Sequence, residues 1–250
     1  MNNIKLQSGN IEQALIDTFL KIDQKLFDKE VKDDLLNEAR RFRSEEESKT
    51  NEKERNKRMD MFKSLFDPIY MEDCNVAMFT GSTACVCVID NDTIYFANAG
   101  DSGAIVITKD ECVKHMTREH KPDNEEEKNR IIKAGGVVED RRVGNLNLSR
   151  SIGDLEYKQN KRIKPEQQII TAHPEITKIN RSDVQYIVIA CDGVWDCKHY
   201  NISEFIFHKI KKEHKLSKII EEFFDKIISK ESRDDGVGCD NMTCIMIQFK

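Results

Sequence analysis

The stretch YIVIACDGVWD, residues 186–196, joins an apolar run to two aspartates that stand four positions apart. Its first five residues are aromatic, β-branched or small, which predicts a strand buried on both faces. A carboxylate at the buried end of such a strand is costly unless a positive group meets it. A metal ion, an arginine or several backbone N–H groups could meet it, whereas Asp-Gly is also a common turn pair. The stretch alone therefore leaves a metal site and a plain turn both open.

The chain as a whole is polar and has no basic bias. Of its 250 residues, 38% are apolar and 34% are charged, and the formal net charge is −5. This length allows one large domain or two small ones, with a sizeable core. Small basic clusters near residues 40–43 and 55–58 are surrounded by acidic residues, so we expect solvated faces and no nucleic-acid partner.

Targeting and redox signals point to the cell interior. The N-terminus, MNNIKLQSGN, lacks the apolar core of a signal peptide, and no apolar run approaches the length that spans a membrane. The eight cysteines include no Cys-x-x-Cys pair, so a zinc site is not expected. Four of them lie in apolar, strand-like runs, where a thiol behaves as a small hydrophobe. We expect a cytoplasmic or nuclear protein with no membrane partner.

The N-terminal region predicts one helix followed by a charged insertion. Asn10 and Gln13 have the spacing of a capping box, and apolar residues recur at helical spacing from 11 to 26. Residues 28–64 are dense in charges of both signs and poor in aromatic residues. We interpret them as a flexible insertion that is helical only around 35–42.

The rest of the chain predicts strands and helices in separate runs. Residues 84–89, 93–98 and 104–107 are typical of an antiparallel meander. Asp123 and Glu126 are expected to cap a short helix that Gly135-Gly136 closes. Segregated strands and helices favour an α+β fold with antiparallel sheets. The later segments are a polar irregular stretch at 142–174, a strand at 186–190, helices near 203–212 and 219–228, and a strand at 243–249.

Three aspartates, Asp101, Asp192 and Asp240, each stand where an apolar strand begins or ends. Hard cations such as Mg²⁺ and Mn²⁺ prefer oxygen ligands, and Mg²⁺ takes roughly six at about 2.1 Å. Carboxylates from different strand ends can converge on such an ion. The pattern indicates a candidate metal site, with structural turn aspartates as the alternative.

Seven short blocks, taken together and in order, resemble the type 2C metal-dependent protein serine/threonine phosphatases. The resemblance runs from about residue 10 to the C-terminus and is interrupted by the charged insertion, and residues 158–174 resemble the family's flap segment. The blocks are GSTA at 81–84, ANAGDS at 97–102, HKP at 120–122, EKNRIIKAGG at 127–136, LSRSIGD at 148–154, ACDGVWD at 190–196 and DNMT at 240–243.

This resemblance implies a single domain, a four-layer α/β/β/α sandwich around two antiparallel sheets. It matches Asp192 and Asp240 to carboxylates of a two-metal centre, and Asp101, Asp192 and Asp196 to a third, weaker metal position. The implied cofactor is Mg²⁺ or Mn²⁺. The implied reaction is hydrolysis of phosphoserine or phosphothreonine in phosphoproteins by a metal-activated water, and we expect a monomer.

Other family residues have no counterpart here. The family carries a phosphate-gripping arginine, a metal-binding glutamate and an Asp-Gly-His-Gly turn upstream of these blocks, but the 250 residues contain no Asp-Gly-His. We therefore assign no catalytic residue, and we expect an N-terminally incomplete domain that by itself hydrolyses substrate at background rate. A pseudophosphatase that binds or regulates phosphoproteins is the alternative. The MED at 71–73 imitates a family motif but follows the first helix, and we interpret it as coincidence.

Four further residues carry weaker expectations. Gly103 stands where the family usually has arginine, and we interpret it as a turn glycine. Arg150 is expected either to contact a substrate phosphate or to form a structural ion pair. His120 and His173 lack the spacing of metal ligands, and we expect them in surface or turn positions.

Overall fold

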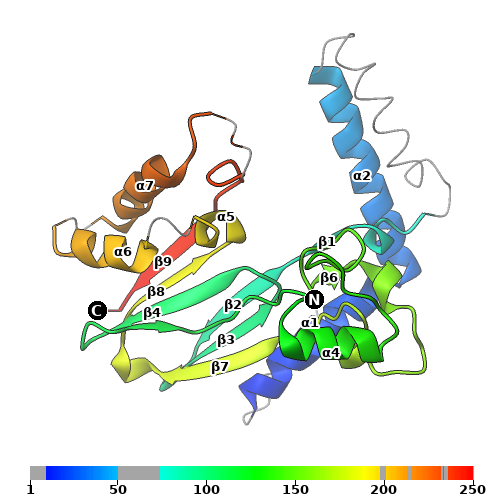
Figure 1. Ribbon diagram of the computed structural model, residues 1–250, viewed down its shortest axis with the longest axis horizontal. Helices are drawn as coiled ribbons and strands as arrows, with labels where there is room; N and C mark the ends of the chain where they lie inside the picture. Colours follow the sequence, from blue (N-terminus) through cyan, green and yellow to red (C-terminus); the bar gives the residue numbers. More distant parts are fainter. Residues whose placement is uncertain are drawn as a thin grey trace.

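Two antiparallel sheets form the centre of the molecule in the computed structural model, which describes residues 10–49, 74–197, 201–212, 215–231, 233 and 236–249. One sheet has the order β2-β3-β7, the other β5-β4-β8-β9, and β1 pairs with β6 beside them (Figure 1). The strands are β1 Gly81–Ser82, β2 Ala84–Ile89, β3 Thr93–Ala99, β4 Gly103–Thr108, β5 Val113–His115, β6 Ile152–Gly153, β7 Glu175–Asn180, β8 Val184–Ala190 and β9 Cys244–Gln248.

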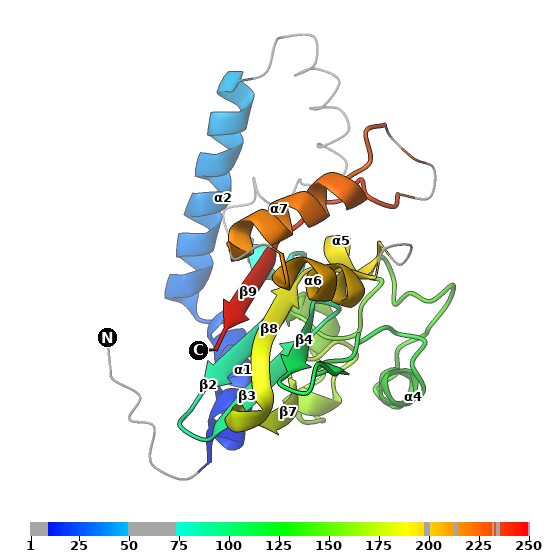
Figure 2. The same ribbon diagram turned by 90° about the vertical axis from the view of Figure 1, so that its left-hand side faces the viewer.

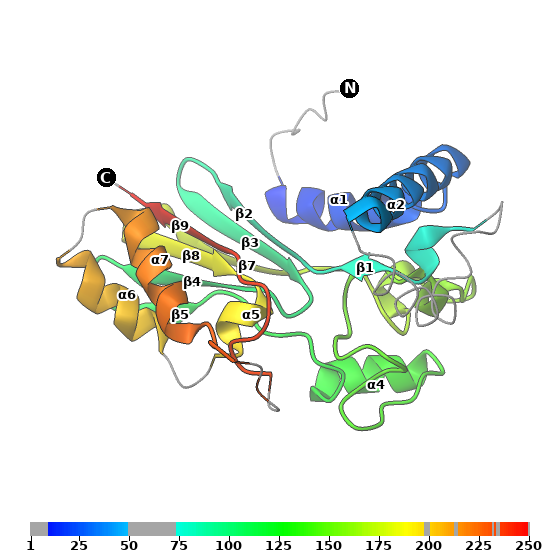
Figure 3. The same cartoon turned by 90° about the horizontal axis from the view of Figure 1, so that it is seen from above.

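Alternation along the strands sorts their side chains into layers. Ala104 and Val106 of β4 pack with Ile94 and Phe96 of β3 between the two sheets. Ile105 of β4 and its neighbours on β8 face the opposite way, toward α6 and α7. Helix α1 covers the outer face of the three-stranded sheet, as Figure 3 shows. The four-layer α/β/β/α sandwich with antiparallel sheets is thus confirmed.

The helices that cover the sheets owe their place to one-faced apolar patterns. Ile219, Phe223 and Ile227 of α7 lie on one face and are buried against the four-stranded sheet. Each such side chain contributes about 1.5–3 kcal/mol on burial. The helices are α1 Ile11–Lys25, α2 Lys29–Lys49, α4 Glu125–Lys133, α5 Asp192–Trp195, α6 Ile202–Ile210 and α7 Leu216–Ile227, with short 3-10 turns at η2 Val76–Met78, η3 Leu155–Lys158, η4 Pro165–Gln167 and η5 Arg181–Asp183.

The predicted three-strand meander is wrong at its second turn. β2 and β3 pair as expected, but β3 then pairs with β7, whereas β4 pairs with β5 and β8 in the other sheet. Gly100, with φ at +118°, carries the chain from one sheet to the other instead of reversing it within one. Hydrophobic alternation gives the same pattern for both outcomes, because each strand buries one face against the other sheet.

Both expected helix caps differ in detail. Asn10 accepts a hydrogen bond from the Gln13 N–H at 3.1 Å, but the Gln13 amide donates to Asp17 instead of closing a capping box. The α4 helix begins after Asn124, and Asp123 accepts from Arg141 at 2.7 Å rather than capping the helix. A nearby charged or amide partner competes successfully for these side chains.

The charged segment begins as a long helix. α2 covers Lys29–Lys49, well beyond the expected helical part at 35–42, and it extends away from the sandwich (Figure 2). The N-terminal half of α2 is held against the rest of the molecule, because Leu36 is buried and the helix contacts η2. The remainder of the expected insertion, residues 50–64, lies outside the described residues, and so does the MED at 71–73. None of the helices described is long and apolar enough to cross a membrane.

The irregular stretch 142–174, called the flap below, is tied to α1 by one buried carboxylate. Asp23 Oδ1 accepts from the Gly153 N–H and from Lys158 Nζ, both at 2.8 Å. Lys158 Nζ also donates to the Ser151 carbonyl at 2.7 Å. The two bonds to Asp23 link residues more than a hundred positions apart and set where the flap leaves the sheets.

Candidate functional site

The turns that carry Asp192 and Asp240 are in direct contact. Strand β8 pairs with β9 up to Ala190 opposite Cys244, and the Cys191 N–H continues the ladder to the Thr243 carbonyl at 3.2 Å. A Cβ added to Gly193 would lie 2.2 Å from the Asn241 carbonyl oxygen, so only glycine allows this approach. The two aspartates, 48 positions apart in sequence, are therefore brought to adjacent turns.

Each of these two carboxylates is oriented by the backbone that follows it. Asp192 Oδ1 accepts from the Gly193 N–H at 2.9 Å, and Asp240 Oδ1 accepts from the Asn241 N–H at 2.7 Å. Asp192 is half-buried at the start of α5, while Asp240 is exposed. The strand β8 and the α5 turn together place Asp192 at the edge of the core.

Asp101 and Asp196 complete an acidic cluster, defined here as Asp101, Asp192, Asp196 and Asp240. β4 pairs with β8 at Gly103 opposite Ala190, which brings the buried Asp101 beside the end of β8. Asp196 ends α5 one turn after Asp192. Burial raises the pKa of Asp192, and the charges of Asp101, Asp240 and Asp196 raise it further. All four predicted site residues thus lie within electrostatic range of one another.

A lysine that the sequence interpretation missed sits at this cluster. Lys121 Nζ donates to Asp101 Oδ2 at 2.5 Å, and the two side chains are 15% and 4% exposed. Burial lowers the pKa of Lys121, but the hydrogen bond and charge of Asp101, with Asp196 and Glu119, raise it overall. The His-Lys-Pro block was quoted for the resemblance, but nothing in its spacing pointed to the cluster.

The donor chemistry of the acidic cluster fits a hard divalent cation. All four groups offer carboxylate oxygens, and burial, followed by the charges of the neighbouring carboxylates, raises the pKa of Asp192. Within the part of the chain that the structure describes, no three Asp, Glu, His or Cys side chains are arranged as a ready ligand set. The four residues are of a type that binds such a cation, and they lie near one another. Their carboxylate oxygens do not all point to one common position.

Gly103 is a glycine for reasons of space rather than turn geometry. It begins β4, and a Cβ there would lie 3.0 Å from Thr117 Oγ1 and 3.1 Å from the Trp195 indole nitrogen. Its φ is not in the left-handed region. Trp195 in turn donates to the Ala190 carbonyl at 2.7 Å and lines one pocket with Asp101.

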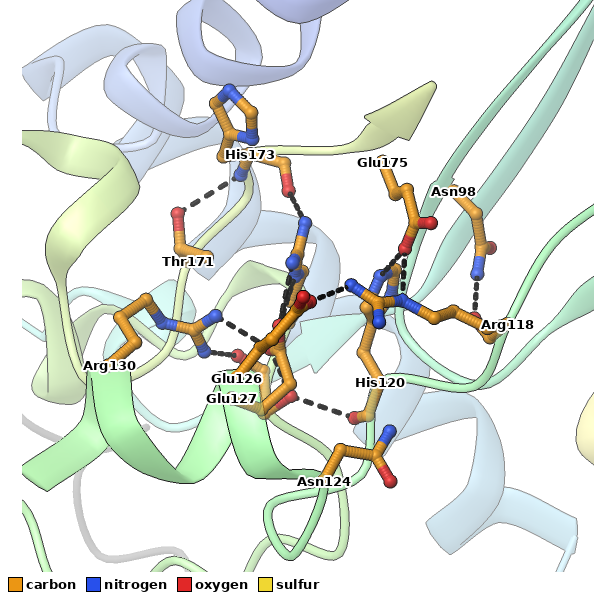
Figure 4. Close-up of polar contacts among 12 residues, drawn as sticks. Asn98, Arg118, His120, Asn124, Glu126, Glu127, Arg130, Thr171, His173 and Glu175 are labelled. Atoms are coloured by element: carbon orange, nitrogen blue, oxygen red, sulfur yellow. Dashed lines mark hydrogen bonds and ion pairs between the residues drawn. The ribbon is translucent and has the colours of Figure 1, made fainter. Parts of the chain in front are cut away.

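A second charged group, called the ion-pair network, is shown in Figure 4, and its His120 is adjacent in sequence to Lys121, which pairs with Asp101. Glu127 of α4 is paired with Arg130 and Arg150, each through a shortest contact of 2.6 Å, and also accepts from Ser149 Oγ at 2.5 Å. Burial alone would raise the pKa of Glu127, but Arg150, Arg130 and Ser149 lower it to about 2. The network consists of Arg118, His120, Glu127, Arg130, Ser149, Arg150 and Glu175.

This arrangement decides between the two interpretations of Arg150. The guanidinium donates to both Glu127 oxygens and to the His173 carbonyl, and only 12% of the side chain is exposed. Each of its three nitrogens donates to a partner within the protein, so Arg150 forms a structural ion pair.

The expectation for His120 is wrong, because the residue is fully buried rather than at the surface. Its Nδ1 lies 3.2 Å from the Gly100 nitrogen, and its Nε2 lies 3.1 Å from Glu175 Oε2. His173 is half-buried, and its backbone N–H donates to Thr171 Oγ1 at 3.1 Å. Ligand spacing was the only signal sought for these histidines, and a buried hydrogen-bonded histidine needs none.

The α/β/β/α sandwich, with carboxylates gathered at the strand ends, places the molecule in the α+β class. A family model described as Protein phosphatase 2C matches residues 2–236. The chain belongs to the protein phosphatase 2C family.

Individual relatives agree with this assignment. The chain is 40% identical over its whole length to "Probable protein phosphatase 2C 6" of Paramecium tetraurelia, of which it covers 74%. It is 44% identical over 68% of its length to "Probable protein phosphatase 2C 60" of Arabidopsis thaliana, of which it covers 48%.

A solved structure of a phosphatase from a pathogenic strain of Toxoplasma gondii matches 63% of the chain with a TM-score of 0.55 and 28% identity, and the chain covers 48% of it. A second, serine-threonine phosphatase 2C from Toxoplasma gondii, matches in fold with a TM-score of 0.53 at 19% identity, over 78% of this chain and 63% of that one. The chain thus spans about half to three quarters of the proteins that it matches. The predicted family, fold class and enzyme class are confirmed.

Proposed function

We propose that this chain acts as a metal-dependent protein serine/threonine phosphatase, in which Asp192 and Asp240 hold a divalent cation and Asp101 and Asp196 line a weaker position. The observation that carries the proposal is the contact between the two turns, where Gly193 leaves no room for a side chain beside Asn241. Turn aspartates with only a capping role would not require so close an approach. The family assignment supports the reaction class.

Mg²⁺ or Mn²⁺ at these oxygens would supply an activated water and neutralise charge on the phosphoryl oxygens of the substrate. The chain's own part is orientation. The Gly193 and Asn241 N–H groups fix the carboxylates of Asp192 and Asp240. The ladder between β8 and β9 keeps the two turns at a constant separation. Such preorganisation is what phosphoryl transfer chiefly needs from a protein.

Phosphoserine and phosphothreonine side chains of proteins are the proposed substrates, and the cytoplasm or nucleus is the proposed compartment. The names of the relatives support protein substrates. All eight cysteines are free thiols, which supports a reducing compartment. We propose that the chain acts as a monomer.

The test compares two proteins: the 250-residue chain, and the same chain preceded by a family segment that carries Asp-Gly-His-Gly. With a phosphothreonine peptide and millimolar Mn²⁺, we expect background hydrolysis by the first and metal-dependent phosphate release by the second. Asp240→Asn in the second should lower the rate by about 10²–10³-fold.

Each other outcome has a meaning. Peptide binding without turnover by the extended protein would favour the phosphoprotein-binding alternative. Turnover by the 250-residue chain that Asp240→Asn abolishes would mean that a residue within it does the work of the Asp-Gly-His-Gly turn. Turnover that Asp240→Asn leaves unchanged would contradict the proposed metal ligand.

A further inference from the structure

A buried histidine holds the turn that carries Asp101. The ring of His120 is 0% exposed, and its Nδ1 lies 3.2 Å from the nitrogen and 3.0 Å from the oxygen of Gly100. The backbone N–H of His120 also donates to the Gly100 carbonyl at 3.0 Å. One residue thus engages both peptide groups of the glycine that precedes Asp101.

The hydrogen bonds define the state of the ring. The Gly100 carbonyl accepts from the His120 N–H and from Asn98 Nδ2 at 3.1 Å, which uses both of its lone pairs. The hydrogen bond with His120, together with Arg118, holds the pKa of Glu175 down at about 2, so its carboxylate accepts from Nε2–H. Nδ1 is left to accept from the Gly100 N–H. Burial lowers the pKa of His120, which favours this neutral Nε2–H form.

Other elements fix the position of the ring. Glu175 begins β7 opposite Asn98 of β3, and its Oε2 also accepts from Arg118 Nε at 2.6 Å (Figure 4). On the other side, the Ser149 N–H donates to the His120 carbonyl at 2.9 Å, and the Ser149 hydroxyl, which donates to Glu127, lies 2.9 Å from the same carbonyl. A strand and the flap therefore hold His120 from two directions.

The turn itself needs such support. Gly100 has φ at +118°, and a Cβ there would lie 2.3 Å from Thr83 Cγ2. Without satisfied peptide groups, a glycine in this buried conformation has little to keep it there. The neighbouring Lys121 binds the Asp101 carboxylate at 2.5 Å, so residues 120 and 121 hold the backbone and the side chain of one turn.

We propose that His120 is a positioning residue, which acts through Gly100 to set how the acidic cluster presents Asp101 to a divalent cation. The ring is hydrogen-bonded to Gly100 and Glu175 and to none of the four carboxylates of the cluster. The inference rests on the proposed metal site. It adds His120 to that site, together with Glu175 and Arg118, which hold the ring in place.

The test uses the single tryptophan of the sequence, Trp195, which lines one pocket with Asp101. Its emission is followed during a Mn²⁺ titration of the 250-residue chain, and melting is measured in EDTA. We expect His120→Gln, which loses the acceptor for the Gly100 N–H, to raise the midpoint about 10-fold, as loss of outer-sphere support does at metal sites. His120→Asn can place an amide oxygen near the Nδ1 position and should recover part of this loss.

Glu126→Gln is the matched control. Glu126 pairs with the same Arg118 as Glu175 does, but its side chain is 70% exposed and forms no hydrogen bond with His120. We expect its Mn²⁺ midpoint to stay within about twofold of the unsubstituted chain. If His120→Gln does not fold, Glu175→Gln decides, with an expected rise of about 3-fold or more.

Three results would overturn the inference. If the His120 and Glu175 variants melt at lower temperature but keep the unsubstituted midpoint, His120 has a structural role only. An imidazole ¹⁵N spectrum that shows Nδ1–H or imidazolium between pH 6 and 8 would also contradict the hydrogen bonding. If the chain gives no Mn²⁺ response although the ring keeps its Nε2–H form, there is no metal site and the inference fails. The hydrogen bonds around the buried ring would still stand.

Discussion

Two groups of carboxylates lie side by side in this molecule, and they differ in what surrounds them. In the ion-pair network, Glu127 and Glu175 face arginines and a histidine, which lower the pKa of each to about 2. In the acidic cluster, burial and three neighbouring carboxylates raise the pKa of Asp192. The same side-chain chemistry is thus balanced internally in one place and left with surplus negative charge in the other. Only the second arrangement gains from binding a cation.

The largest effect is expected in the network. Glu127→Gln leaves Arg130 and Arg150, 14% and 12% exposed, without their carboxylate. Removing one partner of a buried pair typically costs about 3–5 kcal/mol of unfolding free energy. Urea unfolding measures this loss. Glu126→Gln, at an exposed position on the same helix, should change it by less than about 0.5 kcal/mol; equal effects of the two variants would mean that the network is not buried in solution.

The pH dependence should follow the same division. Glu127 and Glu175 have an ordinary pKa of 4.5 and a folded pKa of about 2, so their stabilisation is complete above about pH 4.5 and is lost as the pH falls toward 2. Asp192 contributes to the pH dependence of stability with the opposite sign. Because its pKa is raised in the folded protein, its ionisation lowers the free energy of unfolding as the pH rises above 3.8. Denaturant unfolding between pH 3 and 5 should show stability falling with acid, with a shallower slope in Glu127→Gln. An unchanged slope in that variant would contradict the assigned partners.

An intermediate effect is expected at the boundary of the two groups. Lys121→Gln removes the ammonium group that pairs with the buried Asp101. In EDTA, this substitution should lower the free energy of unfolding by about 1–3 kcal/mol. The same variant should gain more melting temperature from Mn²⁺ than the unsubstituted chain gains. Lys178→Gln is a suitable control, since its pair with Glu12 is 61% and 40% exposed. A Mn²⁺ gain no larger than that of the unsubstituted chain would show that Lys121 and the cation do not share the cluster.

The smallest expected change in stability is a gain rather than a loss. Asp192→Asn keeps an oxygen for the Gly193 N–H but removes one of the repelling charges. In EDTA we expect its melting temperature to rise by about 1–3 °C, whereas its gain from Mn²⁺ should disappear. A lower melting temperature in EDTA would mean that the carboxylate already has a positive partner within the chain.

The sheets could be predicted from the sequence because their strands are compact apolar runs bounded by turn residues. β2 and the strand around residues 186–190 fall where expected, within two residues. The partner of β4 could not be predicted, since Gly100 redirects the chain into the other sheet and alternation is the same in both. The length of α2 was also missed, because mixed charges suit a solvated helix as well as a flexible segment.

For the candidate site, the strand ends located Asp101, Asp192 and Asp240, and the resemblance added Asp196. The roles of Lys121 and His120 could not be predicted, because they arise from contacts across the fold rather than from spacing. The Glu127 and Arg130 pair at i and i+3 was a local hint of the network. The buried partners from residues 149, 150 and 175 come from other elements and leave no local pattern.

The central claim is that the acidic cluster binds a divalent cation, and counting bound Mn²⁺ tests it most directly. The electron paramagnetic resonance signal of free Mn²⁺ is titrated against the 250-residue chain, Asp192→Asn, Asp240→Asn and the control Asp225→Asn, an exposed aspartate on α7. We predict saturable binding that the first two substitutions weaken by about 10-fold or more and that Asp225→Asn leaves unchanged. Equal Mn²⁺ binding by all four proteins, or none by the unsubstituted chain, would contradict the account.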